Sequence, residues 1–303
     1  MSTIRPTPYD GSAPLFRIGL CLLDPAEWID VDDELDVYLS EKARLLARAR
    51  QQVFAAEPET EAAQAEVLGM LAAYLPQRYP DLYRREGDAI AILPAGRRVA
   101  VAAPDGPPLL AAAALVQDDL VLMRRGETGW RLAAASLSFP SSWSLSEKFG
   151  RPLEAIHGPV PGFGAGTRNA ALIARMFDHL RPEAPGLRWN WSVYGDGRLF
   201  HPESADPTAL RFGPGERAES VFLRAERQTL RRLPQSGDIL FTIRVYVDPI
   251  AALERHPDAG RIAAALIEQI AALSAEQLAY KGLTREKARL VARLAEIAGT
   301  ASA

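Results

Sequence analysis

The sequence predicts an α+β protein, in which an antiparallel sheet of about five strands packs against helical layers built from both ends of the chain. Apolar residues recur with a helical period near both termini. Between residues 119 and 248 the pattern changes to short runs with a period of two, which is typical of strands. A glycine-containing loop of hairpin length joins two of these runs, so these two strands are expected to pair antiparallel.

Composition places the chain among ordinary globular proteins. Of its 303 residues, 48% are hydrophobic and 24% are charged, which is enough for a substantial core. We expect a disordered lead over residues 1–14 and a single domain over residues 15–303. The net charge of −3 and the pI near 5.9 give no indication of nucleic acid or an anionic membrane as a partner.

The single cysteine, Cys21, excludes an internal disulfide and fits a reducing compartment. Its apolar neighbours favour a buried, inert thiol over a reactive one. The N-terminus has no signal-peptide core, and no apolar run approaches the roughly 18 residues that a membrane helix needs. We therefore expect a cytoplasmic protein with no membrane partner.

The N-terminal helical layer is expected within residues 15–80. Two helices are predicted there, over residues 32–55 with Asp32 or Asp33 as the cap, and over residues 59–75 with Pro76 and Pro80 ending it. The next segment, residues 84–118, stays open. A strand fits the run that starts at Arg98, and residues 109–115 suit a helix or a strand equally.

The middle of the chain supplies the sheet. Strands are predicted over residues 120–124, 130–139, 187–194, 220–230 and 238–248. Between them, Ser144-Leu-Ser-Glu147 is a capping box that opens a short helix, and residues 165–180 form a longer one. A C-terminal helical layer follows over residues 250–300, with an apolar stripe from Ile262, a second capping box at Ser274 and a last helix capped by Thr284.

His157 is the most informative single residue. Pro152 can start a short helical turn, and Gly158 in the left-handed conformation with Pro159 can end it, so the ring is held rigidly at a helix end. A histidine in that place often only pairs with the last carbonyls of its helix. No second histidine or cysteine lies at the spacing of a zinc site. A single protein ligand is sufficient for haem, because the porphyrin supplies four nitrogens.

Two further segments carry candidate site residues. In Arg188-Trp-Asn-Trp191, Trp189 and Trp191 project from one strand face and Arg188 and Asn190 from the other. The tryptophans suit either the core or the apolar wall of a flat cofactor, and Arg188 suits a carboxylate of that cofactor.

Charged residues also interrupt the two last strands. Arg224 and Glu226 share one face of their strand, opposite Arg227, and Arg244 lies in the next strand. Buried charges need a partner, so two interpretations are open. Either Arg224 and Glu226 form an internal pair, or the arginines bind haem propionates or polarise a bound oxygen ligand.

Motifs for nucleotide binding and for nucleophilic catalysis are absent. The chain has no G-x-G-x-x-G in a βαβ unit, no P-loop lysine motif and no nucleophile elbow. The glycine-rich segment Gly162-Phe-Gly-Ala-Gly166 is predicted to be a flexible loop. The chain is therefore not expected to bind its own reductant.

The segments singled out above resemble the haem-binding α subunit of haem-dependent oxidative N-demethylase, the dimethylamine monooxygenase-like family. The likeness spans roughly residues 15–250. It is carried in order by Phe139-Pro-Ser-Ser-Trp-Ser, Ile156-His-Gly-Pro-Val-Pro, Asn190-Trp, Glu226-Arg-Gln-Thr-Leu-Arg-Arg-Leu-Pro and Phe241-Thr-Ile-Arg-Val-Tyr.

The resemblance implies a PAS-like antiparallel sheet that holds haem b, with His157 as the axial ligand of the iron. It also implies an oxidoreductase that converts a small secondary methylamine to a primary amine and formaldehyde with O2. Electrons would come from NADPH through a flavin and an iron–sulfur centre in a separate reductase subunit. The resemblance does not assign catalytic residues. Because they are charged residues on a strand that is expected to be buried, Arg224, Glu226 and Arg227 are our catalytic candidates. Haem contacts are expected from His157, Arg188, Trp189, Asn190, Trp191 and Arg244.

Two other functions remain open at this point. A PAS-like fold that holds haem also suits a gas or redox sensor, although no kinase or DNA-binding segment accompanies it here. The fold alone, without haem, suits a ligand-binding or interaction protein.

Overall fold

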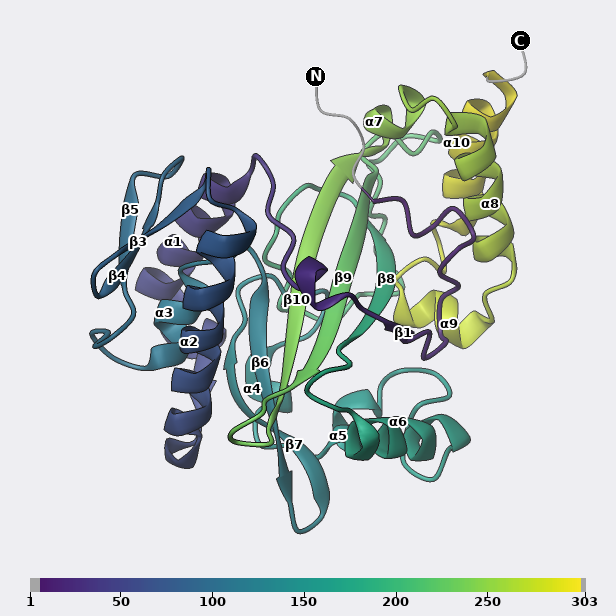
Figure 1. Ribbon diagram of the computed structural model, residues 1–303. Coiled ribbons are helices and arrows are strands. Elements are labelled where there is room, and N and C mark those ends of the chain that lie inside the picture. Colours follow the sequence, from purple (N-terminus) through teal and green to yellow (C-terminus); the bar gives the residue numbers. More distant parts are fainter. Residues whose placement is uncertain (1–5, 301–303) are drawn as a thin grey trace.

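A seven-stranded antiparallel sheet forms the centre of the molecule (Figure 1). The computed structural model describes residues 6–300. Within them the strand order is β1-β8-β9-β10-β6-β7-β2. The strands are β1 Cys21–Leu22, β2 Phe54–Ala56, β6 Asp119–Gly126, β7 Gly129–Ser136, β8 Gly186–Tyr194, β9 Phe222–Arg232 and β10 Ile239–Pro249.

The α+β class is confirmed, but the expected count of about five strands was too low. The five predicted strands are β6 to β10, and β6 and β7 form the expected hairpin. The additional strands β1 and β2 lie at the two edges and have 2 and 3 residues, too few to show a period of two. Cys21 lies in β1 and its thiol is exposed, so the prediction of a buried thiol was wrong.

A second, three-stranded sheet occupies the segment that the sequence left open. It consists of β3 Tyr83–Glu86, β4 Ala89–Ile92 and β5 Arg97–Ala100, so the strand considered at Arg98 is present. The run at residues 109–115 is helical, as α3 Pro108–Ala113. Figure 1 shows this small sheet beside α1 and α2, away from the central sheet.

The N-terminal helices α1 Leu35–Val53 and α2 Glu61–Arg78 pack on one side of the central sheet. Short 3-10 turns precede them at Pro25–Glu27 and Pro58–Thr60. Pro76 lies inside α2, so the prediction that it ends the helix was wrong. A proline this close to the end removes one backbone hydrogen bond, and the last turn still closes through Tyr79 N–H to the Leu75 carbonyl, 2.9 Å.

The C-terminal helices are α7 Ile250–Glu254, α8 Ala259–Ala271, α9 Ala275–Tyr280 and α10 Lys287–Thr300. They pack on the same face of the sheet as the N-terminal helices, but at its β8 and β9 end, where Trp191, Val193 and Leu223 belong to their core. The capping box at Ser274 is present at the start of α9.

Tyr9 packs into the layer of C-terminal helices with 2% of its surface exposed, and Gln269 donates to the Tyr9 carbonyl at 2.7 Å. The expected disordered lead is therefore not seen over residues 6–14, because an aromatic ring anchors it. Residues 1–5 lie outside the described residues. That residues 15–303 form a single domain stays a prediction.

Three short helices cover the lower part of the sheet. They are α4 Leu145–Lys148, which has the predicted capping box, α5 Leu153–His157 and α6 Arg168–His179 (Figure 1). Their apolar side chains share a core with β6, β7 and β10. Over residues 6–300, no helix combines the length and the apolar character needed to span a membrane.

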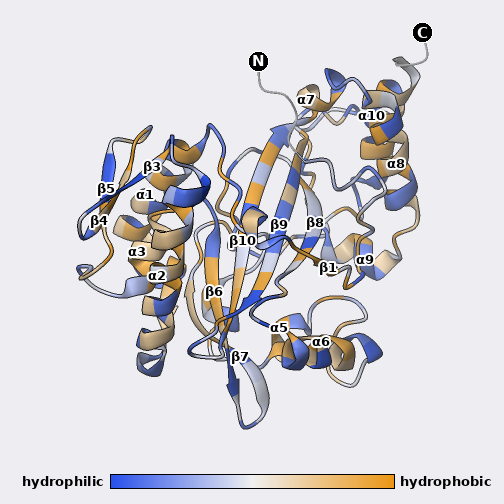
Figure 2. Ribbon diagram, viewed as in Figure 1, coloured by the Kyte–Doolittle hydropathy of each residue, from blue (hydrophilic) through white to orange (hydrophobic). Residues whose placement is uncertain are grey.

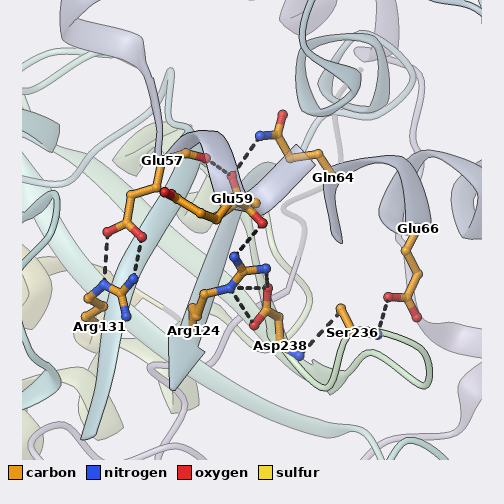
Figure 3. Close-up of polar contacts among 9 residues, drawn as sticks. Glu57, Glu59, Gln64, Glu66, Arg124, Arg131, Ser236 and Asp238 are labelled. Atoms are coloured by element: carbon orange, nitrogen blue, oxygen red, sulfur yellow. Dashed lines mark hydrogen bonds and ion pairs between the residues drawn. The ribbon is translucent and has the colours of Figure 1, made fainter. Parts of the chain in front are cut away.

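Arginine–carboxylate pairs fix the N-terminal helical layer to the sheet (Figure 3). Arg124 of β6 holds Asp238 through Nη2 to Oδ2 at 2.6 Å and also donates to the Glu59 carbonyl. Arg131 of β7 pairs with Glu57 through Nε to Oε1 at 2.9 Å. Each guanidinium presents two parallel donors to its carboxylate, which fixes the orientation of the partner as well as its distance.

Two adjacent buried aspartates at the start of β6 have different surroundings. Asp119 accepts backbone N–H groups of Ser138 and Phe139, both at 2.7 Å, and so fixes the segment that follows β7. Asp118 is equally buried, yet neither of its carboxylate oxygens has a hydrogen-bond partner. Burial raises the pKa of each carboxyl to about 6.

This contrast gives a paired stability prediction. Asp119→Asn loses an acceptor for buried N–H groups and is expected to destabilise the protein by roughly 2 kcal/mol. Asp118→Asn removes a buried charge and is expected to stabilise it at pH 7.5 by up to roughly 2 kcal/mol. The pKa of Asp118 is about 6 in the folded protein and lower in the unfolded chain. The stability gained by Asp118→Asn is therefore complete above pH 6, and it disappears as the pH falls to about 4. Denaturant unfolding of both variants between pH 4 and 8 checks this, and equal destabilisation by both at pH 7.5 would contradict it.

Candidate functional site

A cavity of about 220 Å³ lies between one face of the central sheet, helices α4 to α6 and the N-terminal segment at residues 15–18. Its wall is mainly apolar. The sheet contributes Val121, Met123, Leu132, Leu230, Phe241 and Ile243, and the helices and loops contribute Trp143, Leu153, Ile156, Val160, Phe163, Ile173, Met176 and Phe177. Such a lining excludes water from a ligand and strengthens each polar contact within the cavity.

Four of the nine predicted site residues line this cavity: His157, Arg188, Asn190 and Glu226. Sequence reasoning missed Ser141, Lys148, Gln228, Tyr280 and Lys281, which line it as well. Gln228 could have been found, because it lies two residues after Glu226 in a strand and so shares its face. The two lysines come from α4 and from the end of α9, and nothing in their local sequence indicates the cavity.

His157 occupies the last position of α5, with Pro152 at the N-cap. Its Nδ1 lies 3.0 Å from the Leu153 carbonyl, which fixes the tautomer in which Nδ1 donates and Nε2 keeps its lone pair. Burial, together with the charge of Lys148, lowers the pKa of His157 to about 4. The ring is therefore neutral at pH 7. Gly158 is right-handed at φ −48°, so the predicted left-handed cap was wrong, and the helix ends there without it.

Glu226 is the one carboxylate among the residues that line the cavity, and it is held on both oxygens. Ser141 donates to Oε1, while Asn190 and Gln228 donate to Oε2 at 3.2 and 2.6 Å. Burial alone would raise the pKa of Glu226. The charge of Arg224 and these hydrogen bonds outweigh burial and hold it below its usual value. A fixed negative charge thus lies in an apolar cavity.

Arg224 supports this carboxylate from outside the cavity lining. Its Nε donates to Ser141 Oγ at 2.8 Å, and its Nη2 donates to the Phe139 carbonyl at 2.7 Å. The side chain is 1% exposed. The direct Arg224–Glu226 pair that the sequence left as one alternative is not seen among the described residues. Ser141 lies between the two side chains and bonds to both. Arg224 acts as a positioning residue.

Arg188 is a half-buried cation, and one of its N–H donors has no acceptor among the described residues. It shares a strand face with Asn190, as predicted, and Nη1 donates to Gln228 at 2.9 Å. Its Nε is buried without a hydrogen-bond partner among the described residues. Burial lowers the pKa of Arg188, and it lowers those of Lys148 and Lys281 to about 8. The cavity therefore combines three cationic side chains with one carboxylate.

The two tryptophans lie on the other face of the sheet, so the expectation that they form a cofactor wall needs correction. Trp191 is 1% exposed and belongs to the core beneath the C-terminal helices, where Tyr9 packs edge-on against it at 6.5 Å. Trp189 lies 6.2 Å from the ring of Tyr246. Alternation along β8 places both opposite Arg188 and therefore away from the cavity.

The same reason removes Arg227 and Arg244 from the cavity. Arg227 donates to the carbonyls of Trp28, at 2.9 Å, and Glu27. Arg244 pairs with Asp32 at 2.6 Å between the rings of two tyrosines. Both guanidinium groups are bonded inside the protein on the other face of the sheet, although Nε of Arg244 has no partner among the described residues, and neither residue lines the cavity, contrary to the catalytic and cofactor-binding roles expected of them.

The residues that remain fit a haem group. Among the described residues no three His, Cys, Asp or Glu side chains cluster as a site for a bare metal ion. A haem iron needs only one imidazole from the protein, and His157 offers a neutral ring with a free lone pair. The unpartnered Nε of Arg188 and the two lysines suit the carboxylates of propionates.

Comparison with known families supports this chemistry. Residues 19–291 match the family described as haem-dependent oxidative N-demethylase, alpha subunit-like. The match covers most of the chain and includes every residue that lines the cavity except Leu15, Phe16 and Ile18. This chain therefore belongs to the haem-dependent oxidative N-demethylase, alpha subunit-like family.

Proposed function

We propose that the protein is the haem-binding component of a monooxygenase that removes a methyl group from a small secondary methylamine. The products are the primary amine and formaldehyde, with O2 as the oxidant. One observation carries the proposal: a neutral imidazole with a free Nε2 and a fixed carboxylate share one apolar cavity. The family supports the reaction class, and the cavity supports the assignment of residues.

His157 would hold the iron of haem b, and Arg188, Lys148 and Lys281 would hold the propionates. When bound, haem supplies the activation of dioxygen. The apolar wall keeps bulk water from the reacting atoms. The PAS-like character of the sheet, implied by the family resemblance, is part of this proposal.

Glu226 would bind the substrate. A secondary methylamine is protonated near neutral pH, and a carboxylate is the natural partner of its ammonium group. Ser141, Asn190 and Gln228 donate to Glu226 and fix where the amine sits. These donors occupy three of about four acceptor positions of the carboxylate and leave room for a substrate N–H. Glu226 would also keep the proton of the amine at a defined position.

Electrons would come from NADPH through a separate reductase that carries flavin and an iron–sulfur centre. The chain has no nucleotide-binding motif, and its single cysteine cannot ligate an iron–sulfur cluster. On this proposal a partner protein delivers the electrons for turnover.

The first test is the absorption spectrum of the protein mixed with haemin. The wild type is expected to give a Soret band of a histidine-ligated haem, and His157→Gly is expected to lose it because no other imidazole lines the cavity. Added imidazole should restore the band in the variant. His179→Gly, in the exposed part of α6, is the control and should keep it. An unchanged spectrum in His157→Gly would remove this ligand from the proposal.

The second test concerns protonation of the ligand. Since burial and Lys148 lower the pKa of His157 to about 4, the neutral ring persists to about pH 5. Haem affinity is therefore expected to stay constant from pH 8 to about 5 and to fall below it, whereas an ordinary histidine would protonate near 6.5. Lys148→Met removes one cause of the shift and should raise the pKa of His157, measured by NMR titration of the haem-free protein. A pKa near 6.5 in the wild type would contradict the buried position of the ring.

The third test is catalytic. Glu226→Gln keeps the size of the side chain but removes its charge, so amine-dependent formaldehyde release is expected to fall about a hundredfold while the Soret band remains. The measurement uses a panel of secondary methylamines with an artificial reductant. Glu183→Gln, an exposed control, should retain the wild-type rate. If no amine of the panel gave formaldehyde above background, the demethylase assignment would be wrong.

A further inference from the structure

The outer face of α6 carries a row of arginines around an exposed leucine. Arg168, Leu172, Arg175 and His179 recur every three or four residues, so they form one stripe along the helix. All four are exposed, Leu172 with 39% of its surface. Arg181 follows directly after the helix and is exposed too. We call Arg168, Leu172, Arg175 and Arg181 the α6 basic stripe. Figure 2 shows that hydrophilic and hydrophobic residues both occur along this helix.

The three arginine side chains of the stripe are not bonded to other parts of the described chain. Within residues 6–300 none of them takes part in an ion pair or a side-chain hydrogen bond. The carboxylate of the helix, Asp178, is already paired with Arg125 and accepts from Trp130 Nε1 at 2.9 Å. Glu183 follows the helix, and no ion pair between it and the stripe is seen within residues 6–300. A chain with a net charge of −3 thus concentrates unpaired positive charge at one place.

The inner face of the same helix borders the cavity. Ile173, Met176 and Phe177 line it, and α5, which carries His157, packs against α6. An α-helix is about 10–12 Å in diameter with its side chains. A protein seated on the basic stripe is therefore separated from the cavity by a single helix. Electron tunnelling weakens steeply with distance, so this is a short route into the cavity.

We propose that the α6 basic stripe is the docking surface for an electron-donating protein with an acidic surface. The inference rests on the proposed function, because only a redox reaction in the cavity requires such a donor. Electron-transfer encounters use small interfaces, below about 1,200 Å², and charge complementarity steers them. The helix is about 18 Å long, which matches a small interface. Leu172 supplies an apolar contact at its centre, and arginine is enriched in such contacts.

The test compares two triple variants with the same change in charge. Arg168→Glu/Arg175→Glu/Arg181→Glu alters the stripe, and Arg48→Glu/Arg85→Glu/Arg255→Glu alters exposed arginines on other elements. The probe is an acidic [2Fe–2S] ferredoxin, and its binding to the haem-free protein is measured at low salt. The stripe variant is expected to bind at least about tenfold more weakly than the wild type, while the control set keeps most of the affinity. At about 1 M salt, where the Debye length is about 3 Å, the difference should vanish.

The second measurement follows reduction of the haem-loaded protein by reduced ferredoxin, through the shift of the Soret band. The stripe variant is expected to be reduced at least about tenfold more slowly, whereas dithionite should reduce all three proteins at similar rates. Equal losses in both triple variants, or none in either, would overturn the docking site. Absence of a Soret band would overturn the proposed function instead. In that case ferredoxin binding to the haem-free protein would still test whether the α6 basic stripe is the docking surface.

Discussion

Alternation of side chains along β9 is the constraint on which the site depends. Arg224, Glu226 and Gln228 project to one face of the sheet, and Arg227 projects to the other. A shift of one residue in the pairing with β8 would exchange the two faces. The carboxylate would then lie on the face where Arg227 meets the carbonyls of Glu27 and Trp28, and the cavity would lose the one carboxylate among its lining residues. The register of β8 with β9 thus determines the chemistry of the cavity.

Buried charge on both faces of this sheet is tolerated because almost every group is hydrogen-bonded. Arg227 and Arg244 bond to backbone carbonyls and to Asp32 on one face, and Arg224 bonds to Ser141 on the other. Leaving such a group alone would cost several kcal/mol. Arg188 and Arg244 each keep an Nε without a partner among the described residues, and of these two arginines only Arg188 lines the cavity, where a ligand would meet it.

Local patterns in the sequence were sufficient for the five long strands β6 to β10, the capping boxes and the helix that ends at His157, but not for the short edge strands β1 and β2. They also placed Arg188 and Asn190 on the face opposite Trp189 and Trp191. They could not tell which face borders a cavity, because that depends on helices contributed by distant parts of the chain. Arg244 meets Asp32, 212 residues away, and no local pattern indicates that pairing. For the same reason Lys281 was missed, since α9 reaches the cavity only through tertiary packing. The proposals for the haem ligand and the reaction came from the family resemblance, because spacing alone left both open.

The short outer strands β1 and β2 have a consequence for the behaviour of the protein in concentrated solution. A long flat strand at the margin of a sheet presents a row of free N–H and C=O groups that a second chain can extend. Here the margins have 2 and 3 residues, and Pro25 and Pro58 begin turns soon after each of them. The strands that they flank are longer, and other parts of the chain bond to these strands beyond the short pairings: Gly150 and Arg151 bond to the Leu132 backbone of β7, and Lys281 donates to the Trp191 carbonyl of β8. Fewer edge groups are therefore left for a second molecule than the length of β7 and β8 would suggest.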